Sequence, residues 1–292
     1  MTNIPSQTYM TTPSQPQLRL PANACDAHVH VFGPTHRFPY ASDSAIQPAE
    51  APKEKLFALH NMLGITRCVI VQSMVHGMDN AVVEDAIAAG QGRYLGVALT
   101  PVSVDHTELK RLAAAGFRAV RFNFMKHLGM GATPEELVAL THRLAEHHMH
   151  LQVHFESSLI HSLAPCLQQS AVPVVIDHMG RVDAELGMAH ADFQALCRLL
   201  DDPKFHVKVS GIDRIQSRVP LTTPPYTTGI QLARYLVEHF PDQCVWGTDW
   251  PHPNHTHVPD DGALVDALAQ ILPTEALRQR VLVDNPQTLY RF

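Results

Sequence analysis

The chain has 292 residues, of which 45% are hydrophobic and 17% are charged, and its formal net charge is −6. This length can bury a substantial core in one large α/β domain or in two small ones. A mildly acidic chain without a block of basic residues argues against nucleic acid as the main partner. A small anionic substrate is still compatible with this charge, because it needs only local arginines.

The first residues of the chain are polar, and the cysteines are few. Residues 1–17 are rich in Ser, Thr and Pro and lack an apolar core, so we expect 1–19 to be a disordered tail. No stretch approaches the roughly 18 consecutive apolar residues of a membrane span. The five cysteines are widely spaced and lack a C-x-x-C pair, which is typical of free thiols in a reducing compartment. The sequence therefore predicts a cytoplasmic protein without a membrane partner, and no pattern in it indicates the oligomeric state.

Short apolar runs alternate with amphipathic stretches along the chain. Strands are expected at residues 25–32, 67–73, 94–99, 119–124, 150–155, 173–178, 206–210 and 243–248. Helices are expected at residues 52–63, 80–89, 105–115, 134–147, 158–169, 191–200, 228–240 and 260–272. Eight such alternations predict an α/β fold, a single (β/α)₈ TIM-type barrel over 20–292. A doubly wound sheet is the alternative, but no G-x-G-x-x-G follows the first strand.

Polar residues stand at the ends of four expected strands. The candidate metal ligands among them are His28, His30, His154, His178 and Asp249. Alternate residues of a strand share a face, so the first two histidines should project together. Catalytic groups of such barrels project from the C-terminal ends of the strands, and we expect all five side chains to converge there. Asp177 precedes His178 and is expected to face the other way, in a structural role.

Four imidazoles and one carboxylate suit one Zn²⁺, or another first-row divalent ion, per chain. A metal lowers the pKa of bound water to roughly 7, and Asp249 beside that water would take its proton and return it to the leaving oxygen. Each residue alone has a structural alternative: an H-x-H pair is a weak signal, a lone strand-end histidine is often a core residue, and Asp249 could cap the turn at Trp250-Pro251. The coincidence of all five favours a metal site.

An anionic substrate needs fixed positive charge and hydrogen-bond donors. The candidate substrate-binding residues follow strands two, four and seven and are Ser73, His76, Arg121, Lys126, His127 and Arg214. Arginine suits bidentate binding of a carboxylate or sulfonate. Arg121 could instead form a salt bridge inside the barrel, and Arg214 could pair with Asp213. Turn chemistry would explain Ser73 and His76 almost as well.

Four stretches of these residues carry a family resemblance. They are 26–34 (DAHVHVFGP), 121–124 (RFNF) with Lys126, 177–181 (DHMGR) and 246–253 (WGTDWPHP). The chain resembles the amidohydrolase superfamily from about residue 20 to 292, and within it the 2-pyrone-4,6-dicarboxylate lactonase group. The resemblance implies a (β/α)₈ barrel, water attack on a lactone carbonyl and Asp249 as the base. It also implies that Arg121 and Arg214 hold substrate carboxylates.

Two positions depart from the pattern of that group. The dicarboxylate lactonase carries a tyrosine on strand five and works without a metal, whereas His154 here restores the ligand set of metal-dependent relatives. A second arginine normally follows the RFNF motif, whereas His127 follows Lys126 here. Both changes favour the similar, zinc-using sulfomuconolactone hydrolases, whose substrate carries a carboxylate and a sulfonate and arises in bacterial breakdown of sulfonated aromatics. We therefore expect 4-sulfomuconolactone as the substrate, with 2-pyrone-4,6-dicarboxylate as the alternative.

Two other functions are compatible with parts of this pattern. A non-oxidative decarboxylase is one, because superfamily relatives use a similar ligand set on carboxylated aromatics. A catalytically inactive barrel that binds a small molecule is the other, and the intact ligand set and Asp249 argue against it.

Overall fold

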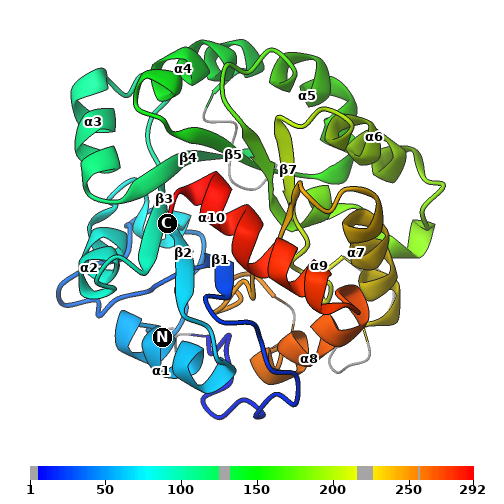
Figure 1. The fold of residues 1–292 in the computed structure, drawn as a ribbon. Coiled ribbons are helices and arrows are strands. Elements are labelled where there is room, and N and C mark those ends of the chain that lie inside the picture. Colours follow the sequence, from blue (N-terminus) through cyan, green and yellow to red (C-terminus); the bar gives the residue numbers. More distant parts are fainter. Residues whose placement is uncertain (1–5, 125–131, 216–225, 256) are drawn as a thin grey trace.

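The computed structural model describes residues 6–124, 132–215, 226–255 and 257–292, and every structural statement below refers to these residues. Eight parallel strands pair in chain order into one sheet. They are β1 (Cys25–Val29), β2 (Arg67–Val71), β3 (Tyr94–Ala98), β4 (Phe117–Phe124), β5 (His150–Phe155), β6 (Val174–Ile176), β7 (Phe205–Lys208) and β8 (Cys244–Val245). Helices surround this sheet in Figure 1, as the alternation of apolar runs and amphipathic stretches predicts.

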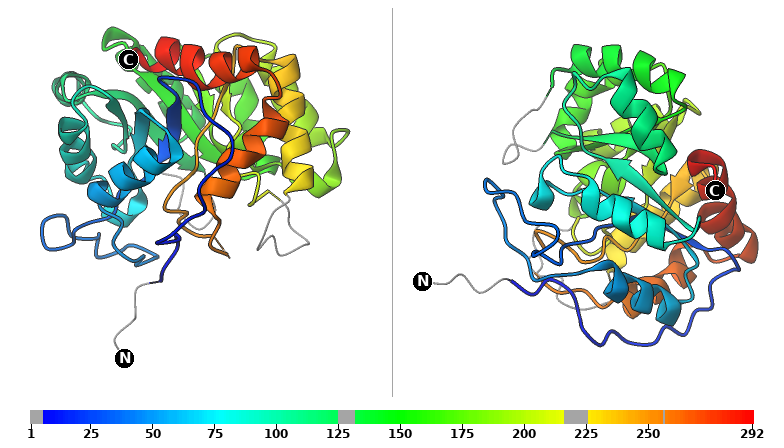
Figure 2. Two further views of the ribbon diagram at one scale, coloured as in Figure 1. Left: turned by 60° about the horizontal axis from the view of Figure 1, so that its bottom comes forward. Right: turned by 90° about the vertical axis from the view of Figure 1, so that its left-hand side faces the viewer.

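The longer helices follow the strands in alternation. They are α1 (Lys53–Leu63), α2 (Ala81–Ala89), α3 (His106–Ala114), α4 (Pro134–Glu146), α5 (Ile160–Leu167), α6 (Ala191–Leu200), α7 (Thr227–His239) and α8 (Asp261–Ile271). The chain ends with α9 (Glu275–Gln279) and α10 (Asn285–Tyr290), and α10 crosses one end of the barrel in both views of Figure 2. None of the helices in the described ranges has the length and apolar composition that a membrane span requires.

Backbone hydrogen bonds bring the segment after β8 back to β1. The amide of Ala27 donates to the carbonyl of Trp246 at 2.8 Å, and the amide of Asp249 donates to the carbonyl of His28 at 2.8 Å. The sheet therefore forms a nearly closed barrel, which confirms the expected (β/α)₈ fold. The same two bonds place Asp249 directly beside the end of β1.

The core has two parts, one inside the sheet and one between the sheet and the helices. The inner cluster takes alternate residues of the strands, for example Cys25 and Ala27 of β1, and Tyr290 of α10 closes it. Simple alternation from these residues would turn His28 outward. The pairing register of β1 shifts between Asp26 and Val29, however, and such a bulge re-aims the following side chains.

Part of the expected disordered tail is packed against the barrel. Tyr9 is only 3% exposed, and its ring lies 5.2 Å from that of Trp250. The backbone amides of Gln17 and Leu18 donate to Asp266 of α8 at 2.8 and 2.9 Å. The prediction of disorder is therefore wrong for residues 6–19, because a buried aromatic anchor and side-chain acceptors on α8 hold a segment whose composition is otherwise polar.

Candidate active site

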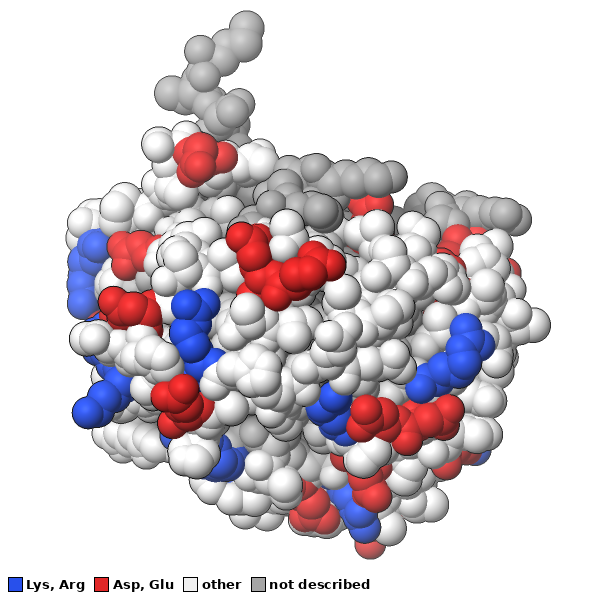
Figure 3. Space-filling model, turned by 90° about the horizontal axis from the view of Figure 1, so that it is seen from above, with Lys and Arg blue, Asp and Glu red and all other residues white. Residues whose placement is uncertain are grey.

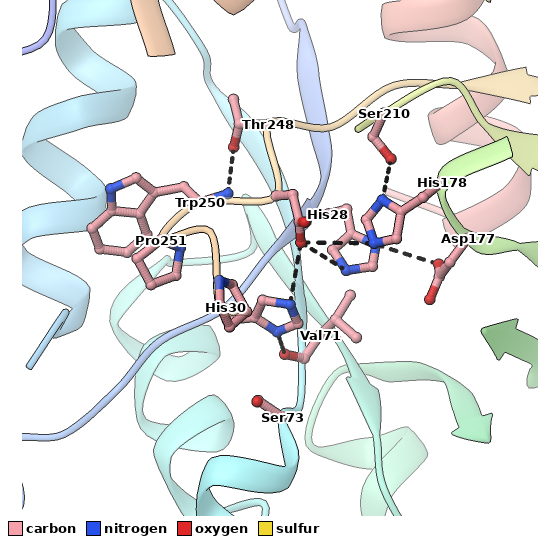
Figure 4. A network of polar contacts seen from close by, with 12 residues as sticks. His28, His30, Val71, Ser73, Asp177, His178, Ser210, Thr248, Trp250 and Pro251 are labelled. Atoms are coloured by element: carbon pink, nitrogen blue, oxygen red, sulfur yellow. Dashed lines mark hydrogen bonds and ion pairs between the residues drawn. The ribbon is translucent and has the colours of Figure 1, made fainter. Parts of the chain in front are cut away.

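Three imidazoles converge on one carboxylate at the C-terminal ends of the strands. Oδ1 of Asp249 lies 3.6 Å from Nε2 of His28, 3.4 Å from Nε2 of His30 and 3.7 Å from Nε2 of His178. All four side chains are buried, and Figure 4 draws the histidines around this point. Residues from β1, from the turn after β6 and from the segment after β8 thus meet as the sequence predicts.

Unusual backbone conformations hold two of these residues. His178 lies in the tight turn Asp177–Arg181, whose backbone is left-handed: φ is 49° at His178, 52° at Met179 and 55° at Arg181. Asp249 has a φ of 67°. A left-handed conformation costs a non-glycine residue roughly 1–2 kcal/mol, and such strain is concentrated at functional sites. The strained backbone therefore lowers the stability of the fold, but it directs both side chains into the mouth of the barrel.

Hydrogen bonds at the second ring nitrogen orient the imidazoles. Nδ1 of His30 lies 2.7 Å from the carbonyl oxygen of Val71, and Nδ1 of His178 lies 2.8 Å from Oγ of Ser210. Because a carbonyl oxygen only accepts, Nδ1 of His30 donates, and its Nε2 presents a lone pair to the site when the ring is neutral. This arrangement, in which an outer partner fixes the tautomer, is typical of histidine metal ligands.

The fourth predicted histidine lies beside the cluster. His154 of β5 is 9% exposed, and its ring centroid is 5.5 Å from that of His178. Its Nδ1 lies 3.2 Å from Oδ1 of Asn123, while its Nε2 is buried without a hydrogen-bond partner. The structure therefore brings His154 next to His178, although it forms no ion pair with Asp249.

A buried charge network lies behind the histidines. Asp177 accepts a hydrogen bond from Nε of Arg121 at 2.8 Å, and its Oδ1 lies 3.3 Å from Nδ1 of His28 and 3.5 Å from Nζ of Lys208. The expectation that Asp177 faces away from the site is wrong. Strand β6 ends at Ile176, so Asp177 already belongs to a turn in which strand alternation no longer applies.

Lys208 is the main functional candidate that we missed in the sequence. It is fully buried, and Nζ lies 3.1 Å from Nδ1 of His28. The sequence does indicate it, because Lys208 is a lone charged residue at the end of the otherwise strand-like run Phe205–Lys208.

Burial and charge set the protonation states of the site. Burial lowers the pKa of His28 to about 3, with a further contribution from Lys208, and burial holds the pKa of His178 and His154 well below the usual value. Burial alone would raise the pKa of Asp249, but His178 and Arg214 hold it well below its usual value. These imidazoles are therefore neutral and the carboxylate is ionised near pH 7, as metal binding requires.

A cavity of about 170 Å³ opens onto this cluster. Of the predicted substrate-binding residues, Ser73, Arg121 and Arg214 line it. His76 does not line it, because its ring is held by the carbonyl of Pro39 and the amide of Gly33. Lys126 and His127 fall outside the described residues. The structure adds to the lining Ser44, Asn123, Arg181 and Asn254.

A larger cavity of about 640 Å³ lies at the N-terminal ends of β5, β6 and β7, and His150, Pro173 and His206 contribute to its wall. It is remote from the Asp249 cluster, so we place the chemistry in the smaller cavity. Figure 3 shows one face of the molecule, on which acidic and basic side chains are interspersed without a continuous basic stripe.

The donor set fits a divalent metal ion. Nε2 of His28, Nε2 of His154 and Oδ1 of Asp249 are buried without a hydrogen-bond partner. His28, His30 and Asp249 each offer a ligand atom within 4.8 Å of the other two. Unpaired buried nitrogen and oxygen atoms are costly, and a shared cation would satisfy them.

Comparison with known proteins identifies the family of this barrel. A family model described as amidohydrolase matches residues 25–292, and the chain therefore belongs to the amidohydrolase family. A relative named 2-pyrone-4,6-dicarboxylate hydrolase, from Comamonas testosteroni, is 40% identical over 97% of this chain and 94% of its own. A relative named 4-sulfomuconolactone hydrolase, from Hydrogenophaga intermedia, is 38% identical over 93% of this chain and 89% of its own.

The fold also matches a crystal structure from Acinetobacter baumannii, described as that of a probable 2-pyrone-4,6-dicarboxylic acid hydrolase with citric acid bound. The TM-score is 0.80 at 27% identity, over 92% of this chain and 100% of that one. The predicted fold and family are thus confirmed.

Proposed function

We propose that this protein is a metal-dependent lactonase that opens a small anionic lactone, with 4-sulfomuconolactone as its substrate. The observation that carries the proposal is the convergence of three imidazoles on Asp249, with His154 beside them. The relatives named as hydrolases of two anionic lactones support the same reaction class.

In this mechanism Asp249 is the base. Its carboxylate, ionised at neutral pH, accepts a proton from the attacking water as the water oxygen bonds to the lactone carbonyl carbon. The ring C–O bond then breaks, and Asp249 returns the proton to the leaving ring oxygen. Arg121 and Arg214 line the cavity and would bind the anionic group of the substrate with the N–H groups that their carboxylate partners leave free.

We propose Zn²⁺ as the cofactor, held by His28, His30, His154, His178 and Asp249. Bound there, it would supply Lewis-acid polarisation of the carbonyl and a lowered pKa for the attacking water. The outer partners Val71 and Ser210 would keep two of the imidazoles in the required orientation. The five free cysteines support a reducing compartment, and we propose the cytoplasm.

A second candidate substrate is 2-pyrone-4,6-dicarboxylate, which the name of the 40% identical relative favours. His154 favours the first candidate, because that position is a tyrosine in the metal-free pattern. The two substrates share the hydrolysed lactone bond and two anionic groups, so the same residues would act on either.

A turnover screen of both lactones, combined with elemental analysis, tests the proposal. We expect about one zinc per chain, rapid opening of 4-sulfomuconolactone and loss of activity on treatment with a chelator. Absence of zinc together with chelator-resistant activity would show that the mechanism needs no metal. Release of carbon dioxide from an aromatic carboxylate without lactone turnover would identify a decarboxylase instead.

A further inference from the structure

Asp26 is a buried carboxylate of β1 that no step of the proposed mechanism uses. It stands two residues before His28, and its side chain is fully buried. The neighbouring Cys25 and Ala27 belong to the core inside the barrel, so strand alternation turns Asp26 to the outer face of the sheet. A buried carboxylate needs hydrogen-bond donors around it, and the positions of those donors indicate what Asp26 holds together.

The donors lie where the barrel closes, and we call the contact between β1 and residues 246–250 the seam. Among the described residues no strand ladder joins β8 to β1, and single backbone hydrogen bonds connect them instead. Besides the two bonds given above, the amide of His30 donates to the carbonyl of Trp250 at 2.7 Å. The candidate ligands His28 and Asp249 lie on opposite sides of the seam, so its geometry sets the distance between them.

The carboxylate of Asp26 joins the two sides of the seam. Its Oδ1 accepts from the backbone amide of His28 at 3.2 Å and from that of Thr248 at 3.0 Å. Its Oδ2 accepts from the hydroxyl of Thr248 at 2.6 Å. One side chain thus binds the backbone of a candidate ligand on β1 and the residue that precedes Asp249.

Thr248 extends this contact to the other side of Asp249. Its hydroxyl accepts from the amide of Trp250 at 3.1 Å, as Figure 4 shows. The amides of Thr248 and Trp250, on either side of Asp249, are therefore both connected to Asp26, one directly and one through the hydroxyl. Asp249 has a φ of 67°, and a non-glycine residue keeps such a conformation only where its surroundings hold it.

The surroundings of Asp26 leave its side chain little freedom. A Cβ atom at Gly247 would lie 2.5 Å from the amide nitrogen of His28 and 3.0 Å from Oδ1 of Asp26, so only glycine allows this close approach. From the helix side, Nε2 of His60 on α1 lies 3.5 Å from Oδ2 of Asp26, and its Nδ1 lies 2.8 Å from the hydroxyl of Tyr94. The carboxylate is thus fixed both at the seam and behind it.

We propose that Asp26 is a positioning residue for the candidate metal site. Through Thr248 it holds the strained backbone of Asp249 against β1, and so keeps Oδ1 of Asp249 at 3.6 Å from Nε2 of His28. Removal of an outer residue that orients metal ligands typically changes metal affinity or activity by roughly 10- to 100-fold. This inference rests on the proposed metal-dependent function, but zinc affinity and the geometry of the site test it without turnover.

Two substitutions at Thr248 separate the effect of its hydroxyl from that of its volume. Thr248→Val removes the hydrogen bonds to Asp26 and Trp250 but keeps the shape, whereas Thr248→Ser keeps the hydroxyl. We expect Thr248→Val to weaken zinc binding, measured by competition with a chromophoric chelator, by roughly 10- to 100-fold. Its kcat for 4-sulfomuconolactone should fall by a similar factor with KM changed little, and Thr248→Ser should behave like the wild-type protein.

Asp26→Asn tests the carboxylate itself, because it turns one acceptor oxygen into a donor. We expect weaker zinc binding in this variant also. Because the two residues act through one contact, the double variant with Thr248→Val should lose less than the sum of the two single losses. Additive losses would show that Asp26 does not act through Thr248 and would overturn the proposed route.

Thr141→Val is the matched control for a lost buried hydroxyl. Thr141 is a buried threonine of α4 whose hydroxyl also donates once, to the carbonyl of Val138 at 2.6 Å, and accepts once, from the amide of Ala171 at 3.0 Å. Both valine variants should lose stability in chemical denaturation, but only Thr248→Val should lose zinc affinity and kcat. If folded Thr248→Val binds zinc as tightly as Thr141→Val does, Asp26 has a structural role only and the proposal is wrong.

Crystal structures of the two Thr248 variants and of the wild-type protein give a readout that needs neither lactone nor metal. We expect the distance between Asp249 and His28 to be kept in Thr248→Ser and to change by roughly 0.5 Å or more in Thr248→Val, which exceeds the tolerance of a preorganised site. An unchanged distance in Thr248→Val would overturn the positioning role. If the wild-type protein binds zinc but opens no lactone, or opens it without zinc, the proposed function fails, while this distance still decides whether Asp26 positions Asp249.

Discussion

The ammonium nitrogen of Lys208 lies 3.1 Å from Nδ1 of His28, and both side chains are fully buried. Lys208 also donates to Oε1 of Gln152 and to the carbonyl of Ala27, each at 2.9 Å, and lies 3.5 Å from Asp177. Burial lowers the pKa of Lys208 to about 8, against the opposing effect of Asp177. Lys208 of β7 thus contacts the ring of His28, a candidate metal ligand on β1, from inside the barrel.

Lys208→Met should destabilise the fold strongly. The substitution keeps the volume of the side chain but removes one cation beside a buried carboxylate, and breaking such a pair costs about 3 kcal/mol or more. Urea unfolding monitored by circular dichroism measures this loss. Lys110→Met, at an exposed position of α3, is the control and should change the free energy of unfolding little. Equal stabilities for the two variants would contradict a structural role for the buried ammonium.

Asp249→Asn should abolish most of the lactonase activity. The amide cannot accept the proton of the attacking water, so we expect kcat to fall roughly 10²- to 10⁴-fold. Steady-state kinetics on 4-sulfomuconolactone checks this, with Asp201→Asn as an exposed control. If Asp249→Asn keeps full activity, another group is the base.

His154→Tyr tests the ligand set independently of turnover. Its Nε2 is buried and unpartnered, so we expect the variant to purify with little zinc where the wild-type protein carries about one ion per chain. Elemental analysis is the measurement, and His142→Tyr on the exposed side of α4 serves as the control. If His154→Tyr carries as much zinc as the wild-type protein, His154 is not a metal ligand.

The buried His150 and the partly buried His206, at the N-terminal ends of β5 and β7, predict a loss of stability in acid. Burial lowers the pKa of His206 to about 4 and holds that of His150 well below its usual value. Unfolded histidines titrate near about 6.5. Between pH 4 and 6.5, roughly, the unfolded chain binds more protons than the folded protein, so the free energy of unfolding falls as the pH falls.

His206→Gln should therefore reduce the pH dependence of stability. We expect it to remove roughly 2 kcal/mol from the difference in the free energy of unfolding between pH 7 and pH 5. Urea unfolding at both values checks this, and His142→Gln is the exposed control. The same pH dependence in His206→Gln as in the wild-type protein would show that other groups cause it.

Tyr9 should anchor the N-terminal segment to the loop that carries Asp249. Its hydroxyl donates to the carbonyl of Glu50 at 2.8 Å, its ring packs against Trp250, and Oγ1 of Thr8 donates to the carbonyl of Pro251. We expect Tyr9→Ala to lower the free energy of unfolding by about 3 kcal/mol and Tyr9→Phe to lower it by about 1 kcal/mol. Chemical denaturation measures both, with the exposed neighbour Met10→Ala as the control. A neutral Tyr9→Ala would mean that the segment contributes no stability.

Some of these features followed from the sequence alone. Apolar runs at regular intervals predict buried parallel strands wherever they lie, so the barrel and its order of elements were predictable. The residue types at the strand ends predicted that the site contains His28, His30, His178 and Asp249, because catalytic groups of this fold lie at one end of the barrel.

Other features were decided only by the tertiary structure. Asp177 faces the site and His76 does not, because each lies in a turn after a strand, where backbone angles and distant partners set the direction of a side chain. Arg121 and Arg214 are paired with internal carboxylates while Arg181 is not, and residue type alone gives the three the same charge. Which charges remain free for a substrate depends on distances between segments far apart in the chain, and local patterning does not encode those distances.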